Sequence, residues 1–184
     1  MIGKIKTLVA HNLKRNRKKS GYTLRDLSNK SNVSVSMISK IENCRLLPSI
    51  STYIKLTTAL DLTLGDLFYD GEVESEEKIS IVRSGEMYVV AMDNYIAKPL
   101  AYKRKNKKME PFIFYYPPNG KIPKHFHENE EMLFLIEGKL EFKFAEEMLV
   151  LEKGDCVYFN GHTVHGAKAI SPEGATAIVV EAIN

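Results

Sequence analysis

Three histidines and one glutamate in the second half of the chain are the residues best suited to bind a metal ion. His125 and His127 flank Phe126, so on an extended strand both imidazoles would point to the same face. Glu131 follows four residues after His127, and His165 ends a later turn-and-strand segment. Three imidazoles and one carboxylate suit a divalent transition metal such as Fe, Mn, Ni, Cu or Zn. The sequence therefore predicts a metal site at His125, His127, Glu131 and His165.

A pair of alternating histidines is weak evidence alone, and other interpretations stay open. The same four side chains could form an empty polar pocket, bind an organic ligand directly, or acquire a metal only during purification. His162 lies close to the second part of the cluster and is interpreted as a turn residue, not as a ligand.

The elements that must position these ligands are short strands. The segment 139–144 alternates polar and apolar residues and places Leu140, Phe142 and Phe144 on one face. Further strands are expected within 112–116, 132–136, 157–159 and 177–180, separated by turns rich in glycine, proline and asparagine. The dense basic run 103–108 is expected to be a solvated hairpin turn, with guidance of an anionic effector as the alternative.

The second part of the chain resembles the cupin superfamily. The first cupin motif appears as GKIPKHFHENEEMLFLIEG from Gly120, and the second as GDCVYFNGHTVH from Gly154, with Asn160 at the usual proline position. The resemblance covers roughly residues 78–183 and implies an all-β double-stranded β-helix barrel with a pocket at its mouth. It also implies the ligand set named above.

The first part of the chain has helical periodicity. Thr23 and Asp26 are spaced as a capping box, and Asn32 can take the left-handed conformation that ends a helix before a tight turn. Ser34 then caps a second short helix over 35–43. Two short helices joined by such a turn, in a basic region, indicate a helix-turn-helix.

This part resembles the XRE-type, lambda-repressor-like helix-turn-helix family. The resemblance rests on TLRDLSNKSNVSVSMISKIEN followed by LPSISTYIKLTTAL, covers roughly residues 5–68, and implies an all-α domain of five helices. Ser49 and Thr63 are expected to cap two of them. Asn32 stands where the family usually has glycine. Cys44 stands where a glycine often ends the recognition helix.

In this family's docking geometry the second helix enters the major groove of DNA. Readout of bases or contact with phosphates is therefore expected from Thr23, Ser34, Val35, Ser36, Ser39, Lys40, Asn43 and Arg45. A basic run adds long-range attraction from Lys14, Arg15, Arg17, Lys18 and Lys19, or is simply a solvated helix end.

Charge divides the chain in the same way. Residues 1–70 carry 12 Lys+Arg against 5 Asp+Glu, a net +7, whereas residues 71–184 carry 14 against 18, a net −4. The sequence predicts an α+β protein of two domains: a helix-turn-helix domain over 1–70, an acidic linker over 71–77, and a cupin domain over 78–184.

Composition narrows the class of protein further. With 44% apolar residues the chain is ordinary for a globular protein, and its apolar runs are far shorter than the roughly 20 residues that cross a bilayer. No signal-peptide core opens the chain, and its two cysteines do not suggest a disulfide framework. We expect a cytoplasmic location and no membrane partner.

Two functions of different classes fit these motifs. The first is a non-enzymatic, sequence-specific transcriptional regulator whose cupin domain senses an unknown small-molecule effector with a bound divalent metal. Such a regulator is expected to be a homodimer on a pseudo-palindromic double-stranded DNA operator. The alternative is a mononuclear iron enzyme similar to hydroxypropylphosphonic acid epoxidase, whose iron triad His127, Glu131 and His165 would match. His125 departs from that pattern because it adds a fourth ligand.

Overall fold

The computed structural model describes residues 2–68, 79–87, 89–92, 94–104 and 107–183. The chain divides into two compact units, one of residues 1–88 with 101–106 and the other of residues 89–100 with 107–184. The predicted linker over 71–77, and the boundaries predicted on either side of it, lie outside the described residues.

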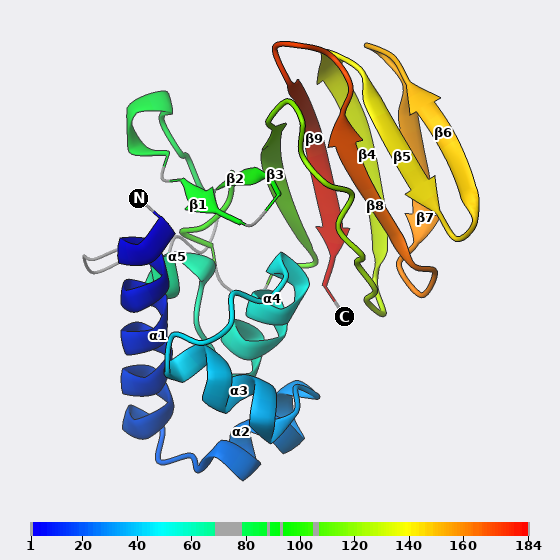
Figure 1. The fold of residues 1–184 in the computed structure, drawn as a ribbon. Helices are drawn as coiled ribbons and strands as arrows, with labels where there is room; N and C mark the ends of the chain where they lie inside the picture. The colour runs from blue at the N-terminus through cyan, green and yellow to red at the C-terminus, as the bar shows by residue number, and fades with distance from the viewer. Residues whose placement is uncertain (1, 69–78, 88, 93, 105–106, 184) are drawn as a thin grey trace. The chain divides into compact units, whose positions relative to one another are not determined.

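The first unit contains the five helices expected from the sequence (Figure 1): α1 (Ile2–Lys19), α2 (Leu24–Ser31), α3 (Val35–Glu42), α4 (Ile50–Ala59) and α5 (Leu64–Phe68). One apolar side chain from each helix is completely buried at their centre: Leu13, Leu27, Ile38, Leu56 and Leu67. Within a helix the buried residues recur at helical spacing, as Val9 and Leu13 do in α1 and Ile38 and Ile41 in α3, so each of these helices buries one stripe.

Local hydrogen bonds set where α2 and α3 begin. Thr23 and Asp26 form the predicted capping box, in which the Asp26 amide donates to Thr23 Oγ1 over 3.1 Å and the Thr23 amide donates to Asp26 Oδ2 over 2.8 Å. Asn32 has φ 58° and ψ 23°, the predicted left-handed conformation. Ser34 Oγ then accepts from the Met37 amide over 3.3 Å and starts α3.

The end of α3 is a left-handed cap without glycine. The helix ends at Glu42, one residue before the predicted end, and Cys44 follows with φ 56°. The Cys44 amide donates to the Ile41 carbonyl over 3.0 Å, and the Arg45 amide donates to the Lys40 carbonyl over 2.7 Å. This pair of bonds is a Schellman motif, so Cys44 takes the position that glycine usually fills.

The second unit consists of two antiparallel sheets. Its strands are β1 (Val90–Ala91), β2 (Ile96–Pro99), β3 (Met109–Tyr116), β4 (Glu130–Glu137), β5 (Leu140–Phe144), β6 (Glu147–Leu151), β7 (Cys156–Asn160), β8 (His165–Ala169) and β9 (Ala175–Ala182). One sheet has the order β1-β2-β3-β9-β4-β7 and the other β6-β5-β8 (Figure 1). The predicted strands lie within β3, β4, β5, β7 and β9, whereas β1, β2, β6 and β8 had no predicted counterpart.

Aromatic side chains fill the space between the two sheets. The ring of Phe159 on β7 lies 5.3 Å from that of Phe142 and 5.7 Å from that of Phe144, both on β5. These residues point inward at alternate positions, as the period of a strand requires. The sheets therefore enclose a core in the manner expected of a cupin barrel.

The basic run over 103–108 is more paired than a solvated turn. Lys103 Nζ lies 2.8 Å from Glu86 Oε2, next to the short helix η1 (Ser84–Glu86) of the first unit. Lys107 Nζ donates to Glu110 Oε1 over 2.7 Å, and both side chains are buried. Of the other basic residues of the run that the structure describes, Arg104 is half-buried and Lys108 is exposed.

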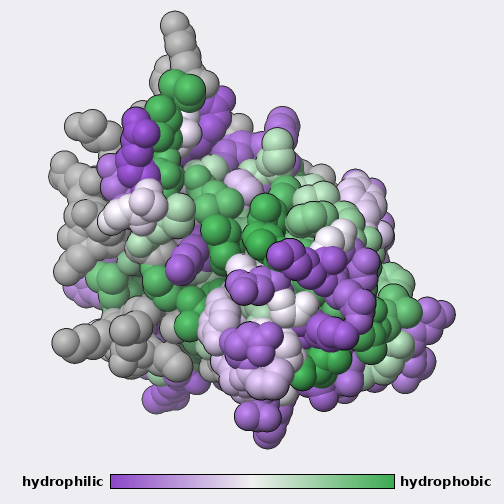
Figure 2. All heavy atoms as spheres, turned by 90° about the horizontal axis from the view of Figure 1, so that it is seen from above, coloured by the Kyte–Doolittle hydropathy of each residue, from purple (hydrophilic) through white to green (hydrophobic). Residues whose placement is uncertain are grey.

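The face of the molecule shown in Figure 2 carries groups of hydrophobic residues with hydrophilic residues between and around them. Several large apolar side chains are exposed, among them Phe126 at 62% and Tyr158 at 67%. Among the described residues, no helix has both the length and the apolar character needed to cross a membrane.

Candidate functional sites

Three of the four predicted metal ligands converge in the structure. The ligand atoms of His127, Glu131 and His165 all lie within 4.8 Å of one another. Glu131 Oε2 is 2.9 Å from His127 Nε2 and 3.6 Å from His165 Nε2. The carboxylate comes from the start of β4 and His165 from the start of β8, while His127 lies on the segment that leads into β4.

His127 and His165 each turn their Nε2 atom toward Glu131. His165 Nδ1 lies 2.8 Å from the Thr163 carbonyl, which accepts a hydrogen bond when Nδ1 carries the proton. His127 Nδ1 faces Glu181, 3.9 Å from its Oε1. Metal-bound histidines usually have a carbonyl or carboxylate beside the second ring nitrogen, which fixes the ring and its tautomer. Two Nε2 atoms and one carboxylate oxygen in this arrangement fit a divalent first-row metal.

Gly161 allows the His127 ring to take this position. A Cβ atom at residue 161 would lie 2.2 Å from His127 Nδ1 and 2.7 Å from the Asn129 carbonyl oxygen. The His127 amide also donates to the Gly161 carbonyl over 3.0 Å. Any larger residue at 161 would displace the imidazole.

The buried charges of the site favour an ionised carboxylate beside a histidine. Burial opposes ionisation of Glu131, but its hydrogen bonds to His127 and His165 lower its pKa to about 2. Burial likewise opposes the charged form of His127, yet the hydrogen bond to Glu131 and the charges of Glu181 and Glu131 raise the pKa of His127 above its usual value. The ionised Glu131 therefore stabilises the protonated form of His127, and a metal would compete with that proton.

Two further buried glutamates extend the site across the sheet, and neither was predicted. Glu181 on β9 lies opposite Glu131 on β4 and opposite Glu110 on β3, so three carboxylates form a row across neighbouring strands. Burial raises the pKa of Glu110, against the opposing charge of Lys107. The sequence signal for Glu181 was its inward position in the alternation that also buries Ala177 and Val179.

His125 lies outside the group that the other three ligands form. Its amide donates to the His165 carbonyl over 2.8 Å as an isolated bridge, so the alternating pair of histidines is not on a continuous strand. The His125 ring is centred 6.0 Å from the ring of His165 and 5.8 Å from that of Tyr95. Burial and then the charge of His165 lower its pKa to about 4, so the ring is neutral at pH 7. His162 is exposed, with Nε2 3.0 Å from the Glu128 carbonyl, away from the cluster.

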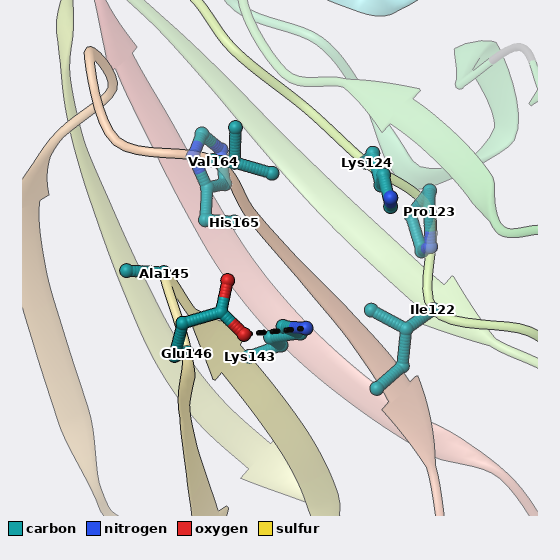
Figure 3. A pocket seen from close by; sticks show the side chains of 8 residues that line it. All are labelled: Ile122, Pro123, Lys124, Lys143, Ala145, Glu146, Val164 and His165. Atoms are coloured by element: carbon teal, nitrogen blue, oxygen red, sulfur yellow. Dashed lines mark ion pairs between the residues drawn. The ribbon is translucent and has the colours of Figure 1, made fainter.

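His165 also lines a pocket of about 540 Å³ in the second unit. Apolar lining comes from Ile122, Pro123, Ala145 and Val164, and charged lining from Lys124, Lys143 and Glu146. Figure 3 shows Lys124 and Lys143 extending toward the same space, with Glu146 beside Lys143 at 3.8 Å. The pocket can therefore accommodate a small molecule with an apolar body and an anionic group.

Seven of the eight predicted DNA-contacting residues lie on α3 or next to its ends, and the eighth, Thr23, caps the start of α2. Seven are exposed and Ser39 is half-buried: Thr23, Ser34, Val35, Ser36, Ser39, Lys40, Asn43 and Arg45. On the opposite side Ile38 and Ile41 are buried, with exposed fractions of 0% and 2%. The structure thus separates the packing face of α3 from a polar face that is open to solvent.

A buried ion pair fixes α3 against α1 and was not predicted. Arg17 Nε donates to Glu42 Oε1 over 2.6 Å, and a second guanidinium nitrogen donates to Oε2 over 2.8 Å. A third bond reaches the Tyr22 carbonyl over 2.7 Å. Arg17 is only 8% exposed, so it is a structural residue and not part of a solvated basic helix end.

Comparisons with known proteins match each unit separately. The helix-turn-helix family matches residues 13–67, and the cupin domain family matches residues 112–181. The HTH-type transcriptional regulator SinR of Bacillus licheniformis is 30% identical over 111 residues, which cover 56% of this chain and 98% of that protein.

Solved structures resemble the chain over nearly its whole length. A helix-turn-helix family transcriptional regulator from Vibrio cholerae has a TM-score of 0.65 at 22% identity, covering 100% of this chain and 99% of the other. Hydroxypropylphosphonic acid epoxidase from S. wedmorenis has a TM-score of 0.50 at 16% identity, covering 98% and 100%. At these levels of sequence identity, the similarity shows a shared fold and nothing more.

Proposed function

Because the chain belongs to the XRE-type helix-turn-helix family of transcriptional regulators and carries a cupin domain, we propose that it reads an operator in double-stranded DNA and that its cupin domain senses a small molecule. The operator is pseudo-palindromic and the protein acts as a homodimer, since two recognition helices then meet successive turns of the major groove. A cytoplasmic location follows from the same role.

The observation that carries the DNA-reading role is the open polar face of α3. Lys40 is long enough to reach guanine O6 or N7, Ser36 can donate or accept, and the Val35 side chain, 41% exposed, suits a thymine methyl. The Schellman motif brings Arg45 to the end of the helix, where phosphate contacts are usual. The net +7 of residues 1–70 adds attraction that is independent of base sequence.

Substitutions on this face test the role directly. Lys40→Ala or Ser36→Ala is expected to cost about 1–3 kcal/mol on the preferred operator and little on random DNA, because base contacts are lost. Arg45→Ala should weaken both alike and reduce the salt dependence by about one unit of slope, because it contacts phosphate. Fluorescence anisotropy over a salt series measures both, with Lys55→Ala on α4 as a charge-matched control. Equal losses on operator and random DNA for Lys40→Ala and Ser36→Ala would contradict base readout.

We propose that His127, Glu131 and His165 hold a divalent transition metal. Such a metal, when bound, supplies a Lewis-acidic position to which an oxygen or nitrogen atom of an effector can bind. The pocket shares His165 with this group, so occupancy of one affects the other. Lys124 and Lys143 favour an effector that carries an anionic group.

A second candidate function has one observation in its favour. Without His125, the converging residues are two histidines and one carboxylate, the set used by non-haem iron oxygenases, which leaves positions open for substrate. An iron enzyme would convert a substrate with His127, Glu131 and His165 intact, whether or not α3 binds DNA. The regulator instead changes its operator affinity on binding metal or effector and converts nothing.

A further inference from the structure

The Nδ1 atom of His127 is buried and makes no hydrogen bond with any residue that the structure describes. The His127 side chain is 2% exposed, so almost none of the ring is open to solvent. The same atom of His165, by contrast, lies 2.8 Å from the Thr163 carbonyl. A buried polar atom without a hydrogen bond costs stability, and in native proteins it often belongs to a functional site. The ring of His127 therefore calls for an acceptor at Nδ1.

The Asn129 carbonyl and the Glu181 carboxylate both lie near this nitrogen. The Asn129 carbonyl already accepts a hydrogen bond from the Gly161 amide over 2.9 Å. Glu181 Oε1 is 3.9 Å from His127 Nδ1. A hydrogen bond to an ionised carboxylate is stronger than one to a neutral carbonyl. Glu181 is thus the better acceptor for a proton on Nδ1.

A carboxylate at position 181 is unfavourable for packing. The inward neighbours of Glu181 along β9, Ala177 and Val179, are buried and apolar. Glu181 itself is 3% exposed and lies opposite Glu131 and Glu110 on the adjoining strands. Burial removes the hydration of a carboxylate, and like charges directly opposite each other on neighbouring strands are destabilising. An apolar side chain would suit this position better, so the glutamate serves the site and not the core.

We propose that Glu181 is a positioning residue of the metal site, which accepts the Nδ1 proton of His127 when Nε2 binds the metal. The inference rests on the proposed site of His127, Glu131 and His165. An imidazole bound to a metal through Nε2 keeps its proton on Nδ1, and a carboxylate beside that proton fixes the ring and makes Nε2 a stronger ligand. Glu181 and Glu131 also bring two negative charges to a divalent cation.

Three variants of the full-length protein separate this role from packing. Glu181→Leu removes the acceptor, whereas Glu181→Gln keeps an acceptor oxygen without the charge. The Zn²⁺ affinity, measured by competition with a chromophoric chelator, should fall by about 10–100-fold in Glu181→Leu, the usual loss when such a partner is removed. Glu181→Gln should lose less. Glu110→Gln should bind Zn²⁺ as wild type does, and it is the matched control because Glu110 is 2% exposed in the same row but pairs with Lys107.

Two further measurements distinguish a positioning residue from a structural one. Metal-free Glu181→Leu protein should melt at or above the temperature of wild type, because a buried charge has been removed from a row of like charges. In Zn²⁺-loaded protein, imidazole NMR should show a slowly exchanging Nδ1 proton on His127 that exchanges faster in Glu181→Leu. The Nδ1 proton of His165 should not change, since the Thr163 carbonyl holds it.

The possible failures have different meanings. Equal Zn²⁺ affinity in Glu181→Leu and wild type would overturn the role of Glu181 and leave the metal site standing, with the Asn129 carbonyl as the acceptor. Melting of both Glu181→Leu and Glu181→Gln far below wild type without metal would make Glu181 a structural residue and would also overturn the proposal. Wild-type protein that binds neither Zn²⁺ nor Fe²⁺, Mn²⁺ or Ni²⁺ would overturn the metal site itself, and this inference with it.

Discussion

At the scale of single residues, the direction of each histidine ring distinguishes the three converging ligands from the fourth. His127 and His165 present Nε2 to the same carboxylate oxygen, while their Nδ1 atoms face Glu181 and the Thr163 carbonyl. His125 pairs with His165 through a backbone bridge, and its ring lies 6.0 Å from the His165 ring, outside the group of three ligand atoms. The residue types and their spacing suggested four equivalent ligands. Spacing along the chain does not show which imidazole faces the carboxylate, so His125 could not be distinguished from the other three.

This difference predicts how the metal responds to substitution. Glu131→Ala or His165→Ala should abolish stoichiometric metal binding, since two remaining ligands are too few for a stable site. His125→Ala should keep close to one metal ion per chain. Metal analysis after reconstitution with Fe, Mn, Ni or Zn measures the content, and His162→Ala is a matched control on the exposed loop. A loss of metal in His125→Ala as complete as in Glu131→Ala would contradict the three-residue site.

Proton competition predicts the pH dependence of metal binding. The raised pKa of His127 means that its imidazole stays protonated above its usual pH range, and a metal must displace that proton. Glu131, with a pKa of about 2, and His125, with a pKa of about 4, do not change charge near neutrality. Metal affinity should therefore rise with pH through the pKa of His127 and then level off. Calorimetric titrations in buffers of different ionisation enthalpy should detect up to one proton released per metal ion bound. A metal affinity that does not change between mildly acidic and mildly basic pH would contradict this competition between proton and metal.

At the scale of elements, helix boundaries were predictable and the contacts between helices were not. Thr23, Asp26, Asn32 and Ser34 act within four residues along the chain, so their roles could be inferred from order alone. The partner of Arg17 is 25 residues away, and only the folded structure brings Glu42 to it. In the sequence, Arg17 could not be distinguished from the solvated basic residues around it.

The buried pair predicts a stability difference between single and double variants. Arg17→Met should lower the free energy of unfolding by about 3 kcal/mol or more, because Glu42 would be left as a buried charge without its partner. Arg17→Met combined with Glu42→Leu should recover much of that loss, since no charge is then buried. Chemical denaturation measures both, with Arg15→Met as the control on the same helix. A double variant less stable than either single one would contradict the explanation.

Strands were predicted where apolar residues form runs and were missed where tertiary pairing decides. The runs in β3, β4 and β9 are long and apolar enough to be recognised, and both faces of these strands are apolar. The residues of β8, HGAKA, have little intrinsic strand preference and extend because β5 pairs with them. The strands β2 and β6 were also missed. β2 ends in a proline, and most residues of β6 are exposed, so neither segment had the apolar pattern of a buried strand.

At the scale of the whole molecule, charge and fold assign different roles to the two units. The net positive charge and the open face of α3 belong to residues 1–70, whereas the converging His127, Glu131 and His165 belong to the net −4 remainder. Binding of metal or effector changes operator affinity only if the bound form favours one arrangement of the two recognition helices over another.

The measurement that tests the central claim most directly is selection of bound fragments from genomic DNA by the full-length protein. The account predicts one enriched, pseudo-palindromic motif whose half-site centres are separated by one helical turn of DNA or a multiple of it. Lys40→Ala protein should recover the motif with weaker enrichment, since a base contact is lost. Recovery of fragments with no motif enriched over the input at low salt would contradict sequence-specific DNA binding, and with it the account of this chain as a regulator.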